Sequence, residues 1–542
     1  MMFKEIRATF TPKKLLSLFT AALLTIGPSA PAFAAQNGEQ PQAVTPIANA
    51  TATNPATPIQ HLVVIFQENI SFDHYFGIYP MATNPPGEPK FKGTANTPAV
   101  NGLTAALLTN NPNLNPANGA SASNPFRLDR SQAVTGDQDH GYTDEQAAFD
   151  SGLMDLFPVH GGFGGSQVMG YFDGNTVTAM WNYAQFFAMS DNSYGTTFGP
   201  STPGLLNLTS GQTNGVINII NGMADEVSGG PDGSFTMIGD ADPLNDVCSS
   251  PTRNQAQMSG PNIGSLLSTS GITWGGFMGG FDLTITNPNG TTGCKRSSAG
   301  LAGTTPDYIA HHSFFGYYPA TANPNHTRPA NVAEIGNNGP ANHQYDINDF
   351  FAAVSAGNFP AVSFLKAPAY QDGHAGYSDP LDEQTFIVNT INFLELQPSW
   401  SSTAVVIMYD DSDGWYDHVM GPIMNTSTGP ADALTGAGAC GTAATSLPGV
   451  NTFANPHALG RCGYGPRLPL MVISPWAKQN FVDHTVTDQS SIIHFIEDNW
   501  LGGQRLGGGS FDGIANSIDQ MFKFTTIRAN GSLFLSPSTG LK

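Results

Sequence analysis

Two segments that lie far apart in the sequence each have the pattern of a buried β-strand that ends in oxygen-bearing side chains. They are residues 59–69 and residues 403–411. β-branched runs of this length are typical of strands that are buried on both faces. In open α/β sheets, ligands bind just beyond the carboxyl ends of the strands. The sequence therefore predicts one shared site from the side chains that follow the two strands, which are Glu68, Asn69, Asp410 and Asp411.

Carboxylate and amide oxygens in this number favour a divalent cation, and a cation favours an anionic substrate such as a phosphate ester. The residue types do not identify the ion. Four oxygen ligands suit Ca²⁺, Mg²⁺ or Mn²⁺, and a carboxylate-rich site also binds Zn²⁺ or Fe. The alternative is that these side chains are ordinary turn residues, which their presence after two separate strands disfavours.

The rest of the chain alternates between strand and helix patterns. Further strands are predicted at 359–365 and 467–474, and helices at 177–189, 382–396 and 490–500. This alternation predicts an α/β fold, namely a three-layer α/β/α sandwich with a mainly parallel sheet.

We expect residues 59–542 to form a single domain that carries the catalytic site. The chain holds 61 Gly and 40 Pro, and only 11% of its residues are charged. This composition predicts long ordered loops rather than a helical bundle. The loop insertions are expected at about 81–125, 236–300 and 421–465.

The first 35 residues have the pattern of a secretion signal. Basic residues precede an apolar run at 15–26, and Ala32-Phe33-Ala34 is a small-x-small cleavage site. No arginine pair precedes the apolar run, which favours a Sec-type route. We therefore expect a secreted or periplasmic protein, with residues 36–58 as a flexible leader. No second apolar run approaches 18 residues, so we expect no stable membrane anchoring.

The chain carries a formal net charge of −21 at pH 7. An acidic surface repels nucleic acid and anionic membranes, so we expect no nucleic-acid partner. It does not exclude an anionic substrate, because a bound cation dominates the local field. The sequence leaves the oligomeric state open.

Four cysteines in an exported chain predict two disulfides. Proximity in the sequence favours the pairs Cys248–Cys294 and Cys440–Cys462, although four cysteines allow three pairings. The alternative of free buried thiols is disfavoured outside the cytoplasm.

The segment from Gly199 to Asn207 carries a helix-start signature, because a hydroxyl residue is followed by Pro203 and an apolar run. One interpretation is that Ser201 or Thr202 only caps the helix. The other uses the same geometry for chemistry. A helix N-terminus attracts an anion, and a serine beside a metal ion can attack phosphorus. The segment alone leaves both interpretations open.

Three motifs resemble those of the secreted bacterial and plant phosphoesterase family, which contains non-specific phospholipases C and an acid phosphatase branch. Residues 67–77 read Gln-Glu-Asn-Ile-Ser-Phe-Asp-His-Tyr-Phe-Gly, and residues 372–374 read Asp-Gly-His. Residues 409–419 read Tyr-Asp-Asp-Ser-Asp-Gly-Trp-Tyr-Asp-His-Val. The resemblance runs from Ile59 to about Trp500. It implies an alkaline-phosphatase-like fold and a hydroxyl nucleophile assisted by a divalent metal ion.

The resemblance also implies roles for single residues. Glu68, Asn69, Asp410 and Asp411 would bind the metal, and Ser201 stands at the position of the nucleophile. The histidines that would contact the phosphoryl group or protonate the leaving group are His140, His312 and His374. The neighbour of His312 is also a histidine, so whether His311 or His312 faces the site stays open. We expect His74 and His418 to hold the motif loops by hydrogen bonds.

Two departures separate the chain from the phospholipase branch. That branch has Thr-x-Pro-Asn-Arg around its nucleophile, whereas this chain has Ser201-Thr-Pro-Gly204-Leu205. The branch has His and Gly where Ser412 and Asp413 stand here. We also expect no additional C-terminal β-domain after the last core helix. All three observations favour the acid phosphatase branch.

The sequence therefore predicts a secreted, metal-dependent hydrolase of small phosphate monoesters that works through a phosphoserine intermediate. The first alternative is a phospholipase C that cleaves phospholipid phosphodiesters. The second is a secreted binding protein that keeps the fold without turnover.

Overall fold

The computed structural model describes residues 54–228, 235–434, 438–443, 447 and 459–542, all within the compact unit Ala50–Lys542. The predicted signal at 1–35 and most of the predicted leader lie outside the described residues.

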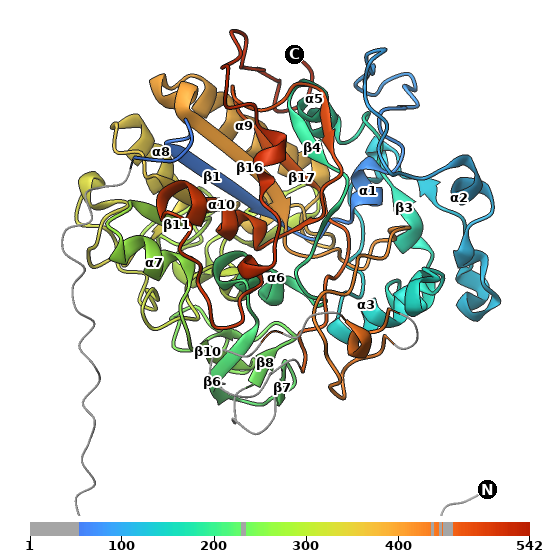
Figure 1. Cartoon of the computed structure of the whole chain (residues 1–542), viewed down its shortest axis with the longest axis horizontal. Helices are drawn as coiled ribbons and strands as arrows, with labels where there is room; N and C mark the ends of the chain where they lie inside the picture. Colours follow the sequence, from blue (N-terminus) through green and yellow to red (C-terminus); the bar gives the residue numbers. More distant parts are fainter. Residues whose placement is uncertain (1–53, 229–234, 435–437, 444–446, 448–458) are drawn as a thin grey trace, which may run out of the picture. The chain divides into compact units, whose positions relative to one another are not determined.

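An eight-stranded sheet forms the centre of this unit, in the order β14-β11-β15-β1-β16-β17-β4-β18 (Figure 1). Strand β17 runs antiparallel to both of its neighbours, and every other neighbouring pair in this sheet is parallel. The predicted α/β fold with a mainly parallel sheet is therefore confirmed. The strands are β14 (Gln344–Asp346), β11 (Trp274–Met278), β15 (Val362–Lys366), β1 (His61–Gln67), β16 (Thr403–Tyr409), β17 (Leu470–Ile473), β4 (Ala188–Ser190) and β18 (Phe481–Asp483).

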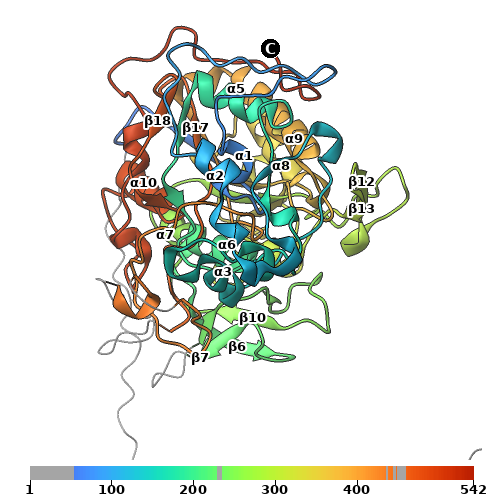
Figure 2. The same ribbon diagram turned by 90° about the vertical axis from the view of Figure 1, so that its right-hand side faces the viewer.

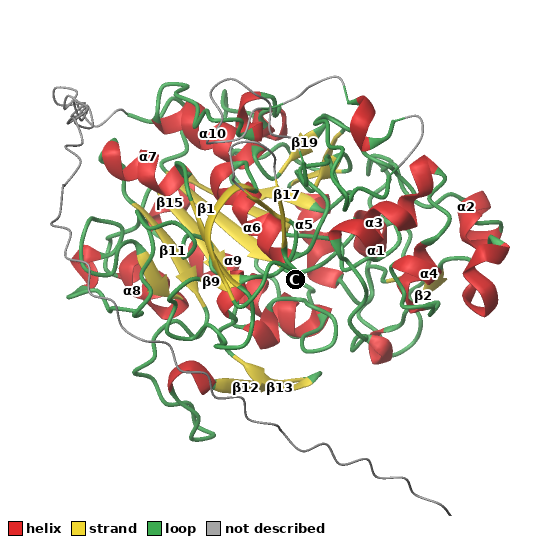
Figure 3. Cartoon of the chain, turned by 90° about the horizontal axis from the view of Figure 1, so that it is seen from below, coloured by secondary structure: helices red, strands yellow, loops and turns green. Residues whose placement is uncertain are grey.

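Helices cover both faces of the sheet, which gives the three layers (Figure 3). On one face lie α6 (Ser201–Ser210), α7 (Ile263–Thr269) and α10 (Ser491–Trp500), and on the other lie α5 (Thr178–Phe186), α8 (Ile347–Ser355) and α9 (Pro380–Glu395). Helix α9 begins two residues before the predicted start at 382, because the Asp379 side chain caps it by accepting hydrogen bonds from the backbone N–H groups of Leu381 and Asp382. The remaining α-helices are short: α1 (Phe72–Phe76), α2 (Ala105–Thr109), α3 (Tyr142–Phe149) and α4 (Phe157–His160).

Smaller sheets lie outside the central one. A five-stranded sheet has the order β7-β8-β6-β10-β9, and Figure 2 shows its strands at the bottom of the view and the hairpin of β12 and β13 at the right. Two further pairs are β19 with β5 and β2 with β3. The bounds are β2 (Phe126–Arg127), β3 (Gly170–Tyr171), β5 (Ser193–Tyr194), β6 (Asn214–Ile220), β7 (Glu226–Ser228), β8 (Phe235–Met237), β9 (Asp242–Pro243), β10 (Gln255–Met258), β12 (Ser297–Gly300), β13 (Gly303–Pro306) and β19 (Thr487–Asp488).

The range 236–300 is not an insertion as a whole, contrary to the expectation from sequence, because it contains the core strand β11 and helix α7. Gly275 and Gly276 conceal this strand, since glycine weakens a strand pattern. Both pack closely against aromatic rings. A Cβ at Gly275 would lie 2.8 Å from the Phe277 ring, and one at Gly276 would lie 3.2 Å from the Phe315 ring.

The helix predicted at 177–189 also ends early. Helix α5 stops at Phe186, and Ala188–Ser190 become β4 because they pair with β17 and β18. Strand β17 begins directly after Pro469, which has no N–H to donate to a sheet.

The structure contains the two disulfides that sequence proximity favours, Cys248–Cys294 and Cys440–Cys462. They link residues 46 and 22 positions apart. In the part of the chain that the structure describes, no helix is both long enough and apolar enough to span a bilayer.

Candidate active site

The predicted oxygen ligands meet because β1 and β16 are adjacent parallel strands in close register. Gln67 pairs with Tyr409, so Glu68 and Asp410 leave the same edge of the sheet side by side. The backbone N–H groups of Asn69 and Asp411 donate to Asp410 Oδ1 over 3.1 and 2.9 Å. Asn69 turns the chain here with φ at 58°, a left-handed conformation that Asn tolerates better than most residues. All of these side chains are buried.

Ser201 joins this group from the N-terminus of α6. Its Oγ lies 3.1 Å from Glu68 Oε2 and 3.2 Å from Asp411 Oδ2, and its single proton can be donated to either. The N-cap residue is Pro200, and no side chain caps the helix. Thr202 turns away, since its Oγ1 donates to the His311 carbonyl oxygen over 3.4 Å. The geometry therefore does not support the interpretation of either hydroxyl as a helix cap.

Gly204 allows α6 to approach the site so closely. A Cβ at this position would lie 2.3 Å from the carbonyl oxygen of Asp410. The first turn of the helix therefore packs directly against the backbone that carries the two aspartates. This contact gives a physical reason for Gly204 where the phospholipase motif has Asn.

His312, rather than His311, faces the carboxylates. His312 Nδ1 lies 3.2 Å from Glu68 Oε1, and its ring is buried. The His311 ring points to Asp242 instead, with 3.6 Å between Nδ1 and Oδ1.

His140 and His374 lie near each other on a further side of the site, with 6.0 Å between their ring centroids. His140 Nδ1 donates to the Gln138 carbonyl oxygen over 2.9 Å, which leaves Nε2 to accept from Asn69 Nδ2 over 3.3 Å. His374 Nδ1 donates to its neighbour's carbonyl oxygen over 2.5 Å. Burial, followed by the nearby His140, lowers the pKa of His374 to about 4.

Ser412 and Asp413, which depart from the phospholipase motif, contact residues that position Ser201 and His140. Ser412 Oγ donates to Glu145 Oε1 over 2.7 Å, and Glu145 Oε2 accepts from the Gly199 N–H over 2.9 Å. Asp413 Oδ1 lies 3.4 Å from His140 Nδ1. These contacts link the loop after β16 to both the start of α6 and the His140 loop.

The two other motif histidines hold loops, as expected. His74 Nδ1 donates to the Gly170 carbonyl oxygen over 2.8 Å, and its ring stacks on Trp415. His418 Nδ1 lies 2.6 Å from Asp73 Oδ2. Arg467, buried beside them, pairs with Asp73.

The donor set fits a divalent cation. Asn69 Oδ1 is buried and has no hydrogen-bond partner among the described residues. Burial and the neighbouring Asp410 raise the pKa of Glu68, and burial raises the pKa of Asp411. Both directions are those of carboxylates whose negative charge is incompletely compensated. A hard cation held by Glu68, Asn69, Asp410 and Asp411 would supply the missing charge and a partner for the amide oxygen.

Two residues of this cluster were not identified as site residues from the sequence. Lys366, at the end of β15, contacts Glu68 Oε1 and lies 3.1 Å from Asp410 Oδ2. Asp372 Oδ2 lies 3.9 Å from His312 Nδ1. A signal was present in the sequence, because Lys366 directly follows a predicted strand and Asp372 lies within the Asp-Gly-His motif.

A cavity of about 440 Å³ opens beside His140 and Pro200, next to the start of α6. Its lining is acidic, and the described residues that form it include no lysine or arginine. The lining aspartates are Asp137, Asp139, Asp144, Asp225 and Asp240.

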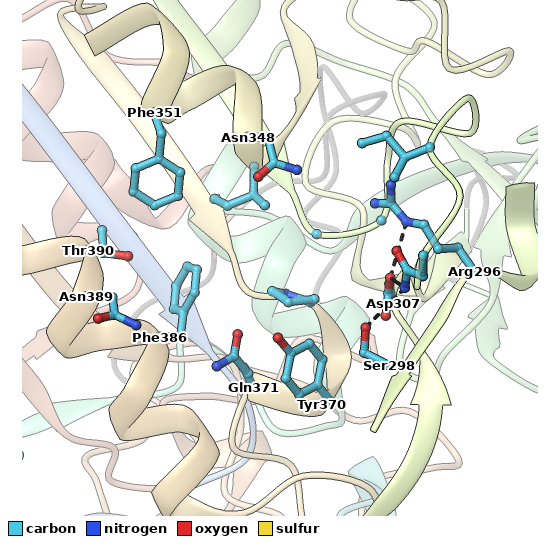
Figure 4. A pocket seen from close by; sticks show the side chains of 16 residues that line it. Arg296, Ser298, Asp307, Asn348, Phe351, Tyr370, Gln371, Phe386, Asn389 and Thr390 are labelled. Carbon is cyan, nitrogen blue, oxygen red and sulfur yellow. Dashed lines mark hydrogen bonds and ion pairs between the residues drawn. The ribbon is translucent and has the colours of Figure 1, made fainter. Parts of the chain in front are cut away.

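A second cavity, of about 320 Å³, is shown in Figure 4. Gln371 forms part of its wall, Arg296 and Asp307 lie on one side, and Phe351 and Thr390 lie on the opposite side. Ser201 and the predicted metal ligands are not among its lining residues.

The chain is similar to proteins named phospholipase C. The "Non-hemolytic phospholipase C" of Pseudomonas aeruginosa is 26% identical over 458 residues, which cover 82% of this chain and 54% of that protein. The chain therefore spans about half the length of that relative. "Phospholipase C B" of Mycobacterium tuberculosis is 24% identical over 459 residues, covering 81% of this chain and 73% of that protein. These names give no support to the acid phosphatase branch.

A solved structure from Vibrio parahaemolyticus, of a protein in the alkaline phosphatase superfamily, matches 75% of this chain and 73% of its own. The sequence identity is 11% and the TM-score is 0.26, so this likeness carries no argument. The family model described as "Phosphoesterase family" matches residues 59–501, which include every predicted ligand, histidine and nucleophile of the site. The chain belongs to the Phosphoesterase family.

Proposed function

We propose that this protein hydrolyses phosphoric esters with Ser201 as the nucleophile. The observation that carries the proposal is that the Ser201 hydroxyl lies within hydrogen-bond distance of two buried carboxylate oxygens, Glu68 Oε2 and Asp411 Oδ2. A serine hydroxyl whose single proton can be donated to either of two buried carboxylates is poised to lose it. Membership in the Phosphoesterase family supports the reaction class.

Glu68, Asn69, Asp410 and Asp411 would hold the divalent ion, and His312 would hold Glu68 in position through the contact at Oε1. When bound, such an ion would lower the pKa of the serine hydroxyl and stabilise negative charge on a phosphoryl oxygen. Ser201 Oγ would then attack phosphorus in line, and the bond from phosphorus to the leaving oxygen would break.

The Ser201 proton would pass to a carboxylate that accepts its hydrogen bond, and a histidine would protonate the leaving oxygen. His140 is better suited to this than His374: although burial acts to lower its pKa, Asp411 and Asp413 raise it well above the usual value, whereas the pKa of His374 is lowered to about 4. Each ring is oriented by its Nδ1, which lies within hydrogen-bond distance of a backbone carbonyl oxygen. Water would then cleave the phosphoserine ester and restore the hydroxyl.

Phospholipid phosphodiesters are the first substrate class of this proposal, which reverses the order expected from sequence. The relatives with the printed name phospholipase C support this order. So does the acidic cavity beside His140. Its aspartates would repel a polyanionic monoester and attract a cationic group carried on the same molecule as the phosphate.

Hydrolysis of small phosphate monoesters is the second candidate. It is favoured by Gly204 and Leu205, which stand where the phospholipase motif has Asn and Arg.

A paired assay tests the proposal. Release of phosphocholine from phosphatidylcholine in mixed micelles is measured beside hydrolysis of para-nitrophenyl phosphate, with Ser201→Ala as the control for contaminating activity. We expect a higher kcat/KM on the lipid. Faster turnover of the aryl monoester would favour the second candidate. A metal-loaded protein that turns over neither substrate would favour the non-catalytic binding protein.

We also propose that the protein is exported. Two disulfides fit an oxidising compartment such as the periplasm or the extracellular space. The amino-terminal sequence of the protein recovered outside the cytoplasm tests this, and it should begin near Gln36, after the predicted signal at 1–35.

A further inference from the structure

Lys366 is a buried ammonium group in contact with two of the predicted metal ligands. It is the last residue of β15, the strand beside β1, and only 1% of its surface is exposed. Its Nζ contacts Glu68 Oε1 and lies 3.1 Å from Asp410 Oδ2. It also lies over the Phe66 ring, 5.4 Å from the ring centre, so the ammonium group makes a cation–π contact as well.

The two oxygens of Glu68 face different partners. Oε2 accepts the hydrogen bond of Ser201, whereas Oε1 contacts Lys366. Asp410 is also held on two sides, because Oδ1 accepts from backbone N–H groups and Oδ2 accepts from Lys366. Each of the two carboxylates therefore has one oxygen in contact with the Lys366 ammonium group. The centre divides into a Ser201 side and a Lys366 side.

The balance of charge favours more than one cation. Four buried carboxylates surround the centre, namely Glu68, Asp372, Asp410 and Asp411. A single divalent ion would leave two of these negative charges uncompensated, and buried charges without partners are costly. Lys366 removes one of the two.

The Lys366 side also has the ligands that an ion would need. Glu68, His312 and Asp372 each offer an atom, and these atoms lie within 4.8 Å of one another. Metal pairs that clamp a phosphoryl group lie about 3.5–4 Å apart. Glu68 offers one oxygen to each of the two sides here.

We propose that Lys366 is an internal cation that stands in the place of a second metal ion. It fixes Glu68 and Asp410 for an ion on the Ser201 side, and it prevents a second ion from binding to Glu68, Asp410, His312 and Asp372. Lys366 is on this basis a positioning residue of the metal centre. The inference rests on the proposed metal centre, but its test counts ions in the absence of substrate and so does not depend on the proposed reaction.

Metal-free protein is titrated with Mn²⁺, and the bound ions are counted by elemental analysis after gel filtration. Electron paramagnetic resonance then distinguishes an isolated Mn²⁺ from a coupled pair. We expect one isolated ion in the wild type and two coupled ions in Lys366→Ala, which removes the ammonium group and opens its space. Lys366→Arg, which keeps the charge, and Lys523→Ala, which removes an exposed lysine, should each bind one ion.

Two coupled ions in the wild type would overturn the proposal, and this measurement needs no variant. A count of one ion in a folded Lys366→Ala would overturn it as well. Circular dichroism checks the fold, and Lys366→Gln is the substitute if Lys366→Ala does not fold, with the same expected count of two.

Discussion

Ser201 Oγ lies 3.1 Å from Glu68 Oε2, although 133 positions separate the two residues in the sequence. The contact joins the end of β1 to the first turn of α6, two elements whose relative placement no local pattern encodes. It also makes Ser201 distinct from Thr202, whose hydroxyl lies against the His311 carbonyl oxygen and the Tyr317 hydroxyl.

Ser201→Ala should therefore lower kcat by several orders of magnitude, because it removes the proposed nucleophile. Its free energy of unfolding should change by only about 1 kcal/mol, the usual net value of a hydrogen bond. Thr202→Ala is the matched control and should keep most of the activity. Steady-state kinetics and denaturant unfolding check both variants. Loss of activity in Thr202→Ala alone would show that the adjacent hydroxyl is the nucleophile.

Removal of metal ions should abolish hydrolysis, and addition of a divalent cation should restore it. Asn69→Ala removes an amide oxygen that has no other partner among the described residues, so metal affinity should fall at least about 10-fold. Competition with a chromophoric chelator measures the affinity. Asn289→Ala, at an exposed turn, should not change it. Full activity after exhaustive chelation would contradict the metal-dependent reaction.

His312→Gln should lower kcat by about 10–100-fold, the range for a residue that orients a metal ligand. The reason is its contact with Glu68 Oε1. His311→Gln, one residue away, should stay near the wild-type value because that ring faces Asp242. Equal losses of kcat in the two variants would show that the effect comes from residues 310–312 as a whole and not from the His312 ring.

The sequence was most informative where one local pattern carries both structure and chemistry. The apolar runs of β1 and β16 predicted two strands, and the residues after them predicted the convergence of Glu68 and Asp410. The choice between His311 and His312 could not be made in this way, because it depends on the packing of residues 310–312 against β9 and α6. Lys366 was not predicted although it directly follows the predicted strand at 359–365, because a cation is not a metal ligand.

The fold was predicted in the same uneven manner. Strand β11 was not predicted because Gly275 and Gly276 interrupt its apolar pattern. The rings of Phe277 and Phe315 pack against these two glycines, and this tertiary contact is not visible in the sequence. The antiparallel direction of β17 depends on its place between β16 and β4, which is a tertiary property.

Gly204→Ala should destabilise the protein by about 1–3 kcal/mol, because the added Cβ would lie 2.3 Å from the Asp410 carbonyl oxygen. In an unobstructed helix the same change would stabilise by up to about 1 kcal/mol. The displaced helix should also lower kcat by moving Ser201. Gly513→Ala is the control, since a Cβ there meets nothing within 4 Å. Thermal unfolding and kinetics check both, and a stabilised Gly204→Ala would show that α6 can move away from Asp410.

Glu383 should make the protein less stable as the pH rises. Burial raises the pKa of this carboxyl to about 8, although hydrogen bonds from the Tyr409 and Tyr75 hydroxyls, each 2.7 Å long, act to lower it. Below about pH 4 the carboxyl is protonated in both the folded and the unfolded states, so it does not make the free energy of unfolding depend on pH. Between there and about pH 8 the unfolded chain loses the proton while the folded chain keeps it, so stability falls with rising pH.

Glu383→Gln removes this ionisation and keeps an oxygen for one tyrosine hydroxyl. The melting temperature of the variant should therefore fall less steeply between pH 5 and pH 8 than that of the wild type. The upper end of this pH range is set by the raised pKa of Glu383 in the folded protein. Thermal unfolding followed by circular dichroism across this series measures the two slopes. Because burial is the largest cause of the shift, parallel slopes would mean that water reaches the carboxyl and that its pKa is close to that of an exposed glutamate.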